Sequence, residues 1–319
     1  MGTFIEIKEL KKYFPIESGF IKKSKVDLKA VDGVSFGIEE GDTFGLVGES
    51  GCGKTTIGKV LLKLYEPTSG KIFFDGKDVT HLQGGALDEY RKNIQAVFQN
   101  PYASLNPRMR IWKLIGEPLV AKGWSVEKVK ERVLELLDLV MLPDDCGPRF
   151  PHEMSAGQRQ QIAIARALSI NPKFIVLDEP TSLLDVSAQA SILNMIVELQ
   201  KKLELTYLFI SHNLAVVRFL SNRVGVMYCG KLVELADSRK LYLAPKHPYS
   251  QALLASILTP NPELQSQEIV LDGDVISPIN PPEGCRFYTR CQAVKEGCKE
   301  NEPPLLEIEP SHFVACHLY

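Results

Sequence analysis

The chain has 319 residues and an ordinary globular composition, with 45% hydrophobic residues, 24% charged residues and a formal net charge of -2. A charge so close to balance gives no support for nucleic acid as a partner. No apolar run approaches the roughly 18–20 residues that span a bilayer, and the first residues lack the character of a secretory signal. We therefore expect a protein that stays in the cytoplasm, where its cysteines do not form structural disulfides.

The first part of the chain predicts strands. Residues 4–10 alternate apolar and charged side chains, which indicates a half-buried edge strand. Tyr13 follows that strand, where its ring either stacks on an adenine or belongs to the core. Residues 15–29 contain several lysines and predict a basic surface loop. Residues 34–38 and 72–74 predict two further strands.

Residues 48–55, Gly-Glu-Ser-Gly-Cys-Gly-Lys-Thr, form a complete G-x-x-x-x-G-K-[ST] phosphate-binding loop. The apolar run 43–47 predicts a buried strand before the loop, and the spacing in 56–64 predicts a helix after it. Backbone N–H groups of such a loop bind phosphate oxygens, while Lys54 neutralises the β- and γ-phosphates and Thr55 completes a Mg²⁺ site. The predicted ATP-binding residues are Tyr13, Gly48, Glu49, Ser50, Gly51, Cys52, Gly53, Lys54, Thr55 and Thr56.

Three more predicted strands lead into polar residues: 94–98 into Gln99, 174–177 into Asp178 and Glu179, and 207–210 into Ser211 and His212. Because the carboxyl ends of parallel strands gather at one edge of a sheet, we expect these groups and the phosphate loop to converge on one γ-phosphate. Asp178 is then directed at Mg²⁺ and Glu179 activates water, the alternative being a merely solvated strand end. The predicted catalytic residues are Glu179, His212, Lys54 and Gln99, and the predicted Mg²⁺ residues are Thr55, Gln99 and Asp178.

The stretch between Gln99 and the strand 174–177 predicts helices. Prolines in residues 100–107 predict a loop without a helix, whereas residues 111–140 carry apolar side chains at helical spacing. Residues 154–158, Met-Ser-Ala-Gly-Gln, come before a predicted helix over 162–168. Ser155 and Gly157 of that motif lie where the helix would begin, which makes a second candidate anion site.

This ordered set of motifs resembles the nucleotide-binding subunits of ABC transporters, over residues 4–236. The resemblance identifies Gln99 as the Q-loop glutamine, 174–179 as the Walker B strand, Asp185 as part of the D-loop, His212 as the switch histidine, and Ser155, Ala156, Gly157 and Gln158 as the signature. It implies that two subunits sandwich two ATP molecules, so that the signature serves the partner's ATP. Ala156 departs from the usual glycine there, and its methyl group is either tolerated or slows the site.

Three further stretches, residues 31–36, 100–109 and 246–254, resemble the oligopeptide and dipeptide importer ATPases, particularly their F-type subunit. The resemblance implies a related D-type ATPase subunit as partner, two membrane permeases, and an extracytoplasmic binding protein that supplies the substrate. It also implies a peripheral place on the cytoplasmic face of the cell membrane. Some members of the group import oligosaccharides or nickel, so the cargo stays open among these.

Cys285, Cys291, Cys298 and Cys316 stand in a proline-rich tail that is short of long apolar runs and would gain from a metal staple. Four thiolates suit either Zn²⁺ or an iron–sulfur cluster. The spacing resembles that of peptide-importer tails, where it is associated with a [4Fe–4S] cluster, which we favour over Zn²⁺ and over free thiols. The other cysteines, Cys52, Cys146 and Cys229, are interpreted as packing residues.

The predicted fold is α/β, an ABC-type P-loop NTPase core with an antiparallel β part, a helical insert and a small metal-stapled C-terminal extension. The core is assigned to residues 1–98 and 163–236, a helical subdomain with the signature to 99–162, and the extension to 237–319. The predicted function is that of a transport-coupled ATPase for di- and oligopeptides. A soluble ABC-type ATPase of DNA repair or translation is the first rival, although its usual long coiled coil is missing, and a redox-sensing regulatory subunit is the second.

Overall fold

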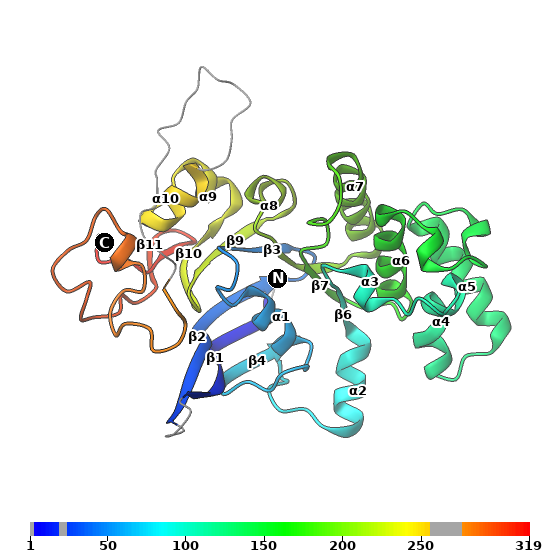
Figure 1. Ribbon diagram of the computed structural model, residues 1–319, viewed down its shortest axis with the longest axis horizontal. Helices are drawn as coiled ribbons and strands as arrows, with labels where there is room; N and C mark the ends of the chain where they lie inside the picture. The colour runs from blue at the N-terminus through cyan, green and yellow to red at the C-terminus, as the bar shows by residue number, and fades with distance from the viewer. Residues whose placement is uncertain (1–2, 19–23, 256–275) are drawn as a thin grey trace, which may run out of the picture. The chain divides into compact units, whose positions relative to one another are not determined.

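The computed structural model describes residues 3–18, 24–255 and 276–319. The chain divides into two compact units (Figure 1). The first unit comprises Met1–Glu39, Thr43–His81 and Ile210–Tyr319, and the second comprises Glu40–Asp42 and Leu82–Phe209. The phosphate loop and the C-terminal extension, residues 237–319, therefore belong to one unit, and the predicted helical stretch belongs to the other. This extension is called the tail below.

An antiparallel sheet in the first unit has the strand order β2 (Ser24–Glu39), β1 (Thr3–Ser18), β4 (Ser69–Phe74) and β5 (Lys77–Asp78). Strand β1 pairs with β2 on one side and with β4 on the other, so the prediction of an edge strand was wrong. The predicted basic loop was also wrong in large part, since β1 and β2 continue their pairing from Pro15↔Asp27 to Ser18↔Ser24. Residues 19–23 of the predicted loop lie outside the described residues.

The phosphate loop follows the parallel strand β3 (Thr43–Val47), all of whose residues are buried. Strand β3 pairs with β9 (Arg223–Tyr228), which pairs antiparallel with β10 (Lys231–Asp237). The C-terminal strands β12 (His312–Val314) and β11 (Leu306–Glu309) continue this sheet beyond β10. The helices of this unit are α1 (Lys54–Leu61), α8 (Leu214–Leu220), α9 (Ser238–Leu243), α10 (Pro248–Ala255) and the short 3-10 helix η3 (Tyr288–Arg290).

A buried carboxylate ties the tail to this sheet. Glu234 of β10 is fully buried and accepts hydrogen bonds from the backbone N–H groups of Lys246 and His247, at 2.8 and 2.9 Å. Its Oε1 also lies 2.7 Å from Nε2 of His312 in β12. A carboxylate is stable in the interior only when such partners replace water. The tail is thus anchored to β10 at two places far apart in the sequence.

The second unit has the strand order β8 (Thr206–Ile210), β7 (Phe174–Asp178) and β6 (Ile94–Val97). Its helices are α2 (Gly84–Asn93), α3 (Pro101–Ser104), α4 (Ile111–Ala121), α5 (Val126–Leu139), α6 (Ala156–Leu168) and α7 (Val186–Leu203), with 3-10 turns η1 (Asp144–Cys146) and η2 (Pro151–Glu153). Helix α3 contradicts the prediction of a loop without a helix. Pro101 takes its first position, where the missing N–H costs nothing, and the Asn100 side chain accepts from the N–H of Tyr102.

The helical spacing over residues 111–140 resolves into two helices, α4 and α5, separated at Gly123. Gly123 has a φ of 78°, which ends α4, and Ser125 caps the start of α5. Among the described residues, no helix combines the length and the apolar character that crossing a membrane requires.

Candidate functional site

Two glycines shape the phosphate loop. Gly48 and Gly53 have φ values of 147° and 111°, in the region that favours glycine. A methyl group added at Gly48 would lie 2.2 Å from the Met227 carbonyl oxygen, and one at Gly53 would lie 2.2 Å from the Ala30 carbonyl oxygen. The loop therefore lies directly against the backbone of its neighbours, and only glycine fits at both positions.

Lys54 is buried at the start of α1, and its Nζ donates to the carbonyl oxygens of Gly48 and Glu49, at 2.7 and 3.0 Å. The ammonium group thus lies inside the curve of the loop, where a phosphate-neutralising lysine is required. Cys52 is buried as predicted, and burial raises the pKa of its thiol. Thr55 and Ser50 are exposed at the loop. The geometry of the predicted loop residues fits the expected anion site.

Glu49 has two partners that the sequence did not indicate. Its backbone N–H donates to the hydroxyl of Tyr249 at 2.9 Å, and its carboxylate oxygens accept from Nη1 of Arg290 at 3.0 and 2.9 Å. Both partners come from the C-terminal tail of the same unit. The signal that could have found Arg290 is weak, since an arginine near cysteines has no distinctive spacing.

Tyr13 lies half-buried on β1, and its hydroxyl donates to Asp32 of β2. The other carboxylate oxygen of Asp32 accepts from the buried Arg286 and lies 3.6 Å from Nζ of Lys231. Burial alone would raise the pKa of Asp32, but the hydrogen bond from Tyr13 and the charges of Lys231 and Arg286 outweigh it and hold the pKa below its usual value. The predicted stacking of Tyr13 on adenine stays a prediction.

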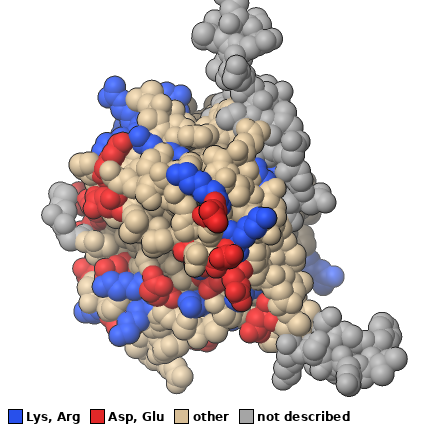
Figure 2. All heavy atoms as spheres, turned by 90° about the vertical axis from the view of Figure 1, so that its left-hand side faces the viewer, with Lys and Arg blue, Asp and Glu red and all other residues tan. Residues whose placement is uncertain are grey.

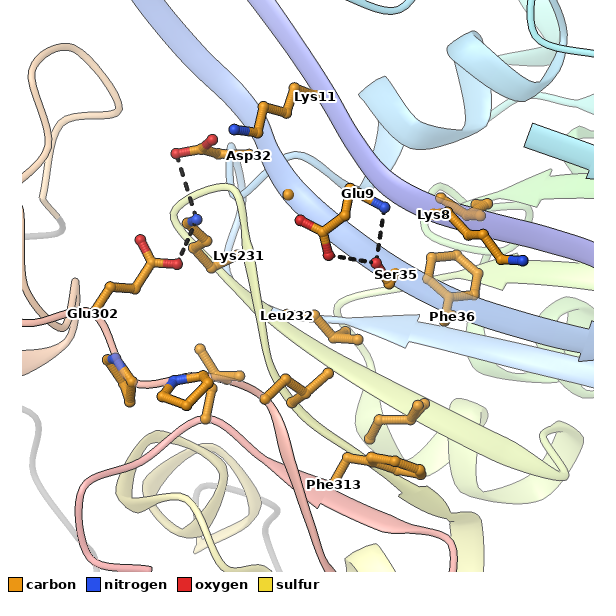
Figure 3. A pocket seen from close by; sticks show the side chains of 18 of the residues that line it. Lys8, Glu9, Lys11, Asp32, Ser35, Phe36, Lys231, Leu232, Glu302 and Phe313 are labelled. Atoms are coloured by element: carbon orange, nitrogen blue, oxygen red, sulfur yellow. Dashed lines mark hydrogen bonds and ion pairs between the residues drawn. The ribbon is translucent and has the colours of Figure 1, made fainter. Parts of the chain in front are cut away.

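The same network borders a groove of about 1030 Å³ in the first unit (Figure 3). Lys231 bridges Asp32 on one side and Glu302 of the tail, at 2.6 Å, on the other, and Glu9 accepts from Ser35 nearby. The tail thereby reaches the antiparallel sheet through paired charges.

In the second unit, Gln99 and Glu179 are in contact, because Nε2 of Gln99 donates to Oε2 of Glu179 at 2.9 Å. Asp178 is buried at the end of β7, directly before Glu179. Glu179 has a φ of 50°, a strained conformation for a residue with a side chain. Such strain is retained where the surrounding structure fixes a functional side chain. Two of the predicted catalytic residues are thus brought together.

Two motifs of the second unit lie at helix N-termini. Ser155 caps α6 in a capping box with Gln158: the Ser155 hydroxyl accepts from the Gln158 N–H at 3.2 Å, and the Gln158 side chain accepts from the Ser155 N–H at 2.9 Å. Asp185 caps α7 by accepting from the N–H of Ala188 at 2.9 Å. Ala156 is exposed at the first turn of α6. The structure thus gives Ser155 and Asp185 a local role beside the predicted one.

His212 belongs to the first unit, where it is exposed just before Asn213, the residue that caps α8. The phosphate loop and His212 belong to one unit, and Gln99, Asp178 and Glu179 belong to the other. The predicted convergence of all these groups on one γ-phosphate stays a prediction.

The cysteines of the tail, Cys285, Cys291, Cys298 and Cys316, border one cavity together with Phe287 and His247. All seven cysteines fall within the described ranges, and none of them forms a disulfide. Burial raises the pKa of Cys285 to about 11 and also raises those of Cys291 and Cys316. Within the parts of the chain that the structure describes, no three His, Cys, Asp or Glu side chains are placed to hold one metal ion.

Figure 2 shows one face of the molecule, on which basic and acidic side chains alternate. Several ion pairs of the tail have this character, such as Lys246 with Glu309 at 2.7 Å. On this face, mixed charge of this kind agrees with the net charge of -2.

Two family models match the chain. The model described as ABC transporter matches residues 31–182, and the model described as oligopeptide/dipeptide transporter, C-terminal region, matches residues 233–298. The oligopeptide transport ATP-binding protein AppF of Bacillus subtilis is 51% identical over 99% of this chain and 98% of its own length. The chain belongs to the ATP-binding subunits of ABC transporters, in the oligopeptide/dipeptide importer family.

Other relatives agree with this membership. A putative peptide import ATP-binding protein of Brucella ovis is 49% identical over 91% of this chain and 92% of its own. The solved dimeric structure of MJ0796, a bacterial ABC transporter cassette, is 28% identical with a TM-score of 0.64, over 74% of this chain and 99% of that one. CbiO1 of Clostridium perfringens, at 24% identity, a TM-score of 0.66, and 76% and 92% coverage, shows the fold alone.

As an ABC ATP-binding subunit, the chain is an ATPase with the α/β P-loop NTPase fold. ATP is its nucleotide, hydrolysis with Mg²⁺ is expected of this class, and membrane permeases and a second ATPase are the partners that membership implies. The prediction of this family from the sequence motifs is confirmed.

Proposed function

We propose that this subunit hydrolyses ATP to drive the import of di- and oligopeptides through partner permeases. The observation that carries the proposal is the 51% identity to AppF along essentially the full length of both chains, because it includes the tail as well as the nucleotide motifs. The substrate class is taken from such relatives, whose names specify oligopeptide or peptide transport.

In the proposed mechanism, ATP closes a sandwich of two ATPase subunits. Lys54 neutralises the β- and γ-phosphates, and Thr55, Gln99 and Asp178 are the residues that would hold Mg²⁺. Glu179 accepts a proton from the attacking water, and the hydrogen bond from Gln99 supports its orientation. His212 and Lys54 stabilise the charge on the γ-phosphate, while Ser155, Ala156, Gly157 and Gln158 contact the partner's ATP. Tyr13 stacks on the adenine.

Replacing Glu179 with Gln tests the motor. The amide keeps the shape of the side chain but cannot accept the proton, so we expect hydrolysis to fall at least about 100-fold while ATP binding is retained. The measurements are phosphate release and retention of labelled ATP by the transporter reconstituted in lipid. Glu198→Gln, on an exposed position of α7, is the matched control and should behave like the wild type. Normal hydrolysis by Glu179→Gln would contradict the assignment.

The same preparation tests the cargo. Binding protein loaded with short peptides should stimulate hydrolysis, and Glu179→Gln should abolish the stimulation. Hydrolysis that is intact but responds instead to oligosaccharides or nickel chelates would keep the motor and reassign the substrate.

We further infer an F-type role, with a related D-type subunit as the second ATPase and the cytoplasmic face of the cell membrane as the location. The motifs at residues 31–36, 100–109 and 246–254 support this subfamily. Co-purification of a distinct second ATPase with the permeases supports a heteromeric pair, and two copies of this chain in one transporter would exclude it.

We also propose a [4Fe–4S] cluster in the tail, with Zn²⁺ as the alternative. The support for the proposal is the donor set, because four thiols border one cavity, and the N–H groups of Ala293 and Lys295 donate to the sulfurs of Cys291 and Cys298 at 3.3 and 3.4 Å. Binding would draw the thiols closer together, since no three of these side chains are placed to hold one ion among the described residues. A bound cluster would crosslink the tail. Anaerobic purification should give about four iron atoms per chain and none in a variant with Ser at Cys285 and Cys291. Zinc in the wild type would favour the alternative over the cluster, and the absence of any metal would contradict both.

A further inference from the structure

The tail segment 285–291 carries two arginines whose side chains are largely buried, one on each side of Phe287. The side chain of Arg286 is 4% exposed and that of Arg290 is 7% exposed. A guanidinium group stays charged, so its burial costs free energy unless an opposite charge and hydrogen bonds compensate. The partners of these two arginines therefore show what the segment is built to hold.

Arg290 holds the phosphate loop. Its Nη1 donates to both carboxylate oxygens of Glu49, at 3.0 and 2.9 Å, and this pairing raises the pKa of Arg290. Glu49 is the residue after Gly48, so it opens the wrapped part of the loop. Tyr249 holds the backbone of the same residue by accepting from its N–H at 2.9 Å. Glu49 is therefore fixed at the side chain and at the main chain by residues of the tail.

The charge of Glu49 makes this contact relevant to nucleotide binding. A carboxylate in a loop that binds a polyanion repels the phosphates, and the repulsion is strong where solvent is partly excluded. The Glu49 side chain is only 25% exposed, and Arg290 is the cation within ion-pair distance of it among the described residues. The ion pair with Arg290 thus offsets the negative charge of Glu49 and fixes the position of this residue in the loop.

The segment that carries Arg290 is itself firmly held. Phe287 is buried and packs against the rings of Tyr228 and Tyr249, at centroid distances of 5.2 and 5.4 Å. Arg286 donates to Asp32 and to the carbonyl oxygen of Cys229. These contacts place Arg290 at a defined position relative to β9 and β2, so the ion pair can transmit that position to the loop.

We propose that Arg290 is a positioning residue of the phosphate loop, and that the affinity for ATP depends on its ion pair with Glu49. The inference rests on the proposed function only in that this loop binds ATP. It assigns the tail a role in nucleotide binding that is separate from the cargo.

The test is Arg290→Met, measured in the reconstituted transporter as KM and kcat for ATP, and in the full-length chain as binding of a fluorescent ATP analogue. The uncompensated charge of Glu49 should raise KM and Kd about tenfold, with kcat within about threefold of wild type, because the lost interaction affects binding of the phosphates. The decisive readout is rescue. Adding Glu49→Gln removes the repulsive charge, so the double variant should recover most of the lost affinity.

Two further variants keep the test decisive. Arg290→Lys retains a charge near Glu49 and should lose less affinity than Arg290→Met, even if the latter folds poorly. Lys246→Met removes the tail ion pair with Glu309, which includes no residue of the phosphate loop, and should leave KM unchanged. Wild-type affinity in Arg290→Met, or an equal loss with and without Glu49→Gln, would overturn the proposal. The two proposals can fail separately. If hydrolysis did not respond to peptides but Arg290→Met still weakened ATP binding, the role of Arg290 would stand and only the peptide cargo would be rejected.

Discussion

The phosphate loop and the signature turn both lead into the N-terminus of a helix, but they are built in different ways. The phosphate loop begins α1 with Gly53, which has a left-handed φ and no side-chain cap. The signature begins α6 with Ser155, whose hydroxyl and backbone complete a capping box with Gln158. One turn depends on the absence of a side chain, and the other depends on the presence of one.

The difference explains why the two turns tolerate different substitutions. A methyl group at Gly53 would overlap the Ala30 carbonyl at 2.2 Å, whereas one at Gly157 would meet only the Ala188 side chain, at an ordinary 3.5 Å. The extra methyl of Ala156 likewise lies on an exposed position of the second unit. A helix start closed by side chains can accept alanine, while a loop wrapped against backbone cannot.

The largest expected effect comes from Gly53→Ala. The added Cβ needs a strained φ and a shift of backbone, so the free energy of unfolding should fall by about 3 kcal/mol and ATP binding should be lost. Urea unfolding and binding of a fluorescent ATP analogue measure the two effects. Gly157→Ala is the matched variant at the signature, and its stability should change by less than about 1 kcal/mol. Equal destabilisation by both substitutions would remove the proposed difference between the turns.

A smaller effect is expected from Ser155→Ala. Loss of the cap leaves N–H groups of α6 unpaired, so stability should fall by about 1 kcal/mol in thermal or urea unfolding. Ser125→Ala is the comparison, because the Ser125 hydroxyl accepts from the Lys128 N–H over a longer distance, 3.5 Å, than the 3.2 Å of the Ser155 cap. Its loss should be the smaller of the two. If Ser155→Ala were neutral, the signature turn would not depend on its side chain for stability.

The sequence predicted the parts of the molecule that depend on neighbouring residues. The strand before Gly48, the helix after Lys54, and the strand that ends in Asp178 all follow from local periodicity and motif spacing. The edge assignment of residues 4–10 failed, because the alternation of side chains describes the two faces of a strand and not how many neighbours pair with it.

The contacts that join distant segments were not predictable from the sequence. Arg290 and Glu49 are 241 residues apart, and Arg286 and Asp32 are 254 apart. Any of the many arginines and carboxylates could form such pairs, and spacing along the chain carries no information about which do. Helix α3 differs from the prediction for a local reason, because proline breaks the interior of a helix but suits its first position.

The ion pair between Glu49 and Arg290 also bears on how the subunit is made. The ribosome releases the phosphate loop first and adds Arg290 only 241 residues later, which takes roughly 10–50 s at typical rates of synthesis. During that interval the nascent chain has the glycines and the lysine of the loop but not the residue that holds Glu49. The contact that completes the phosphate loop therefore forms late, and a product that terminates before Arg290 would lack this ion pair.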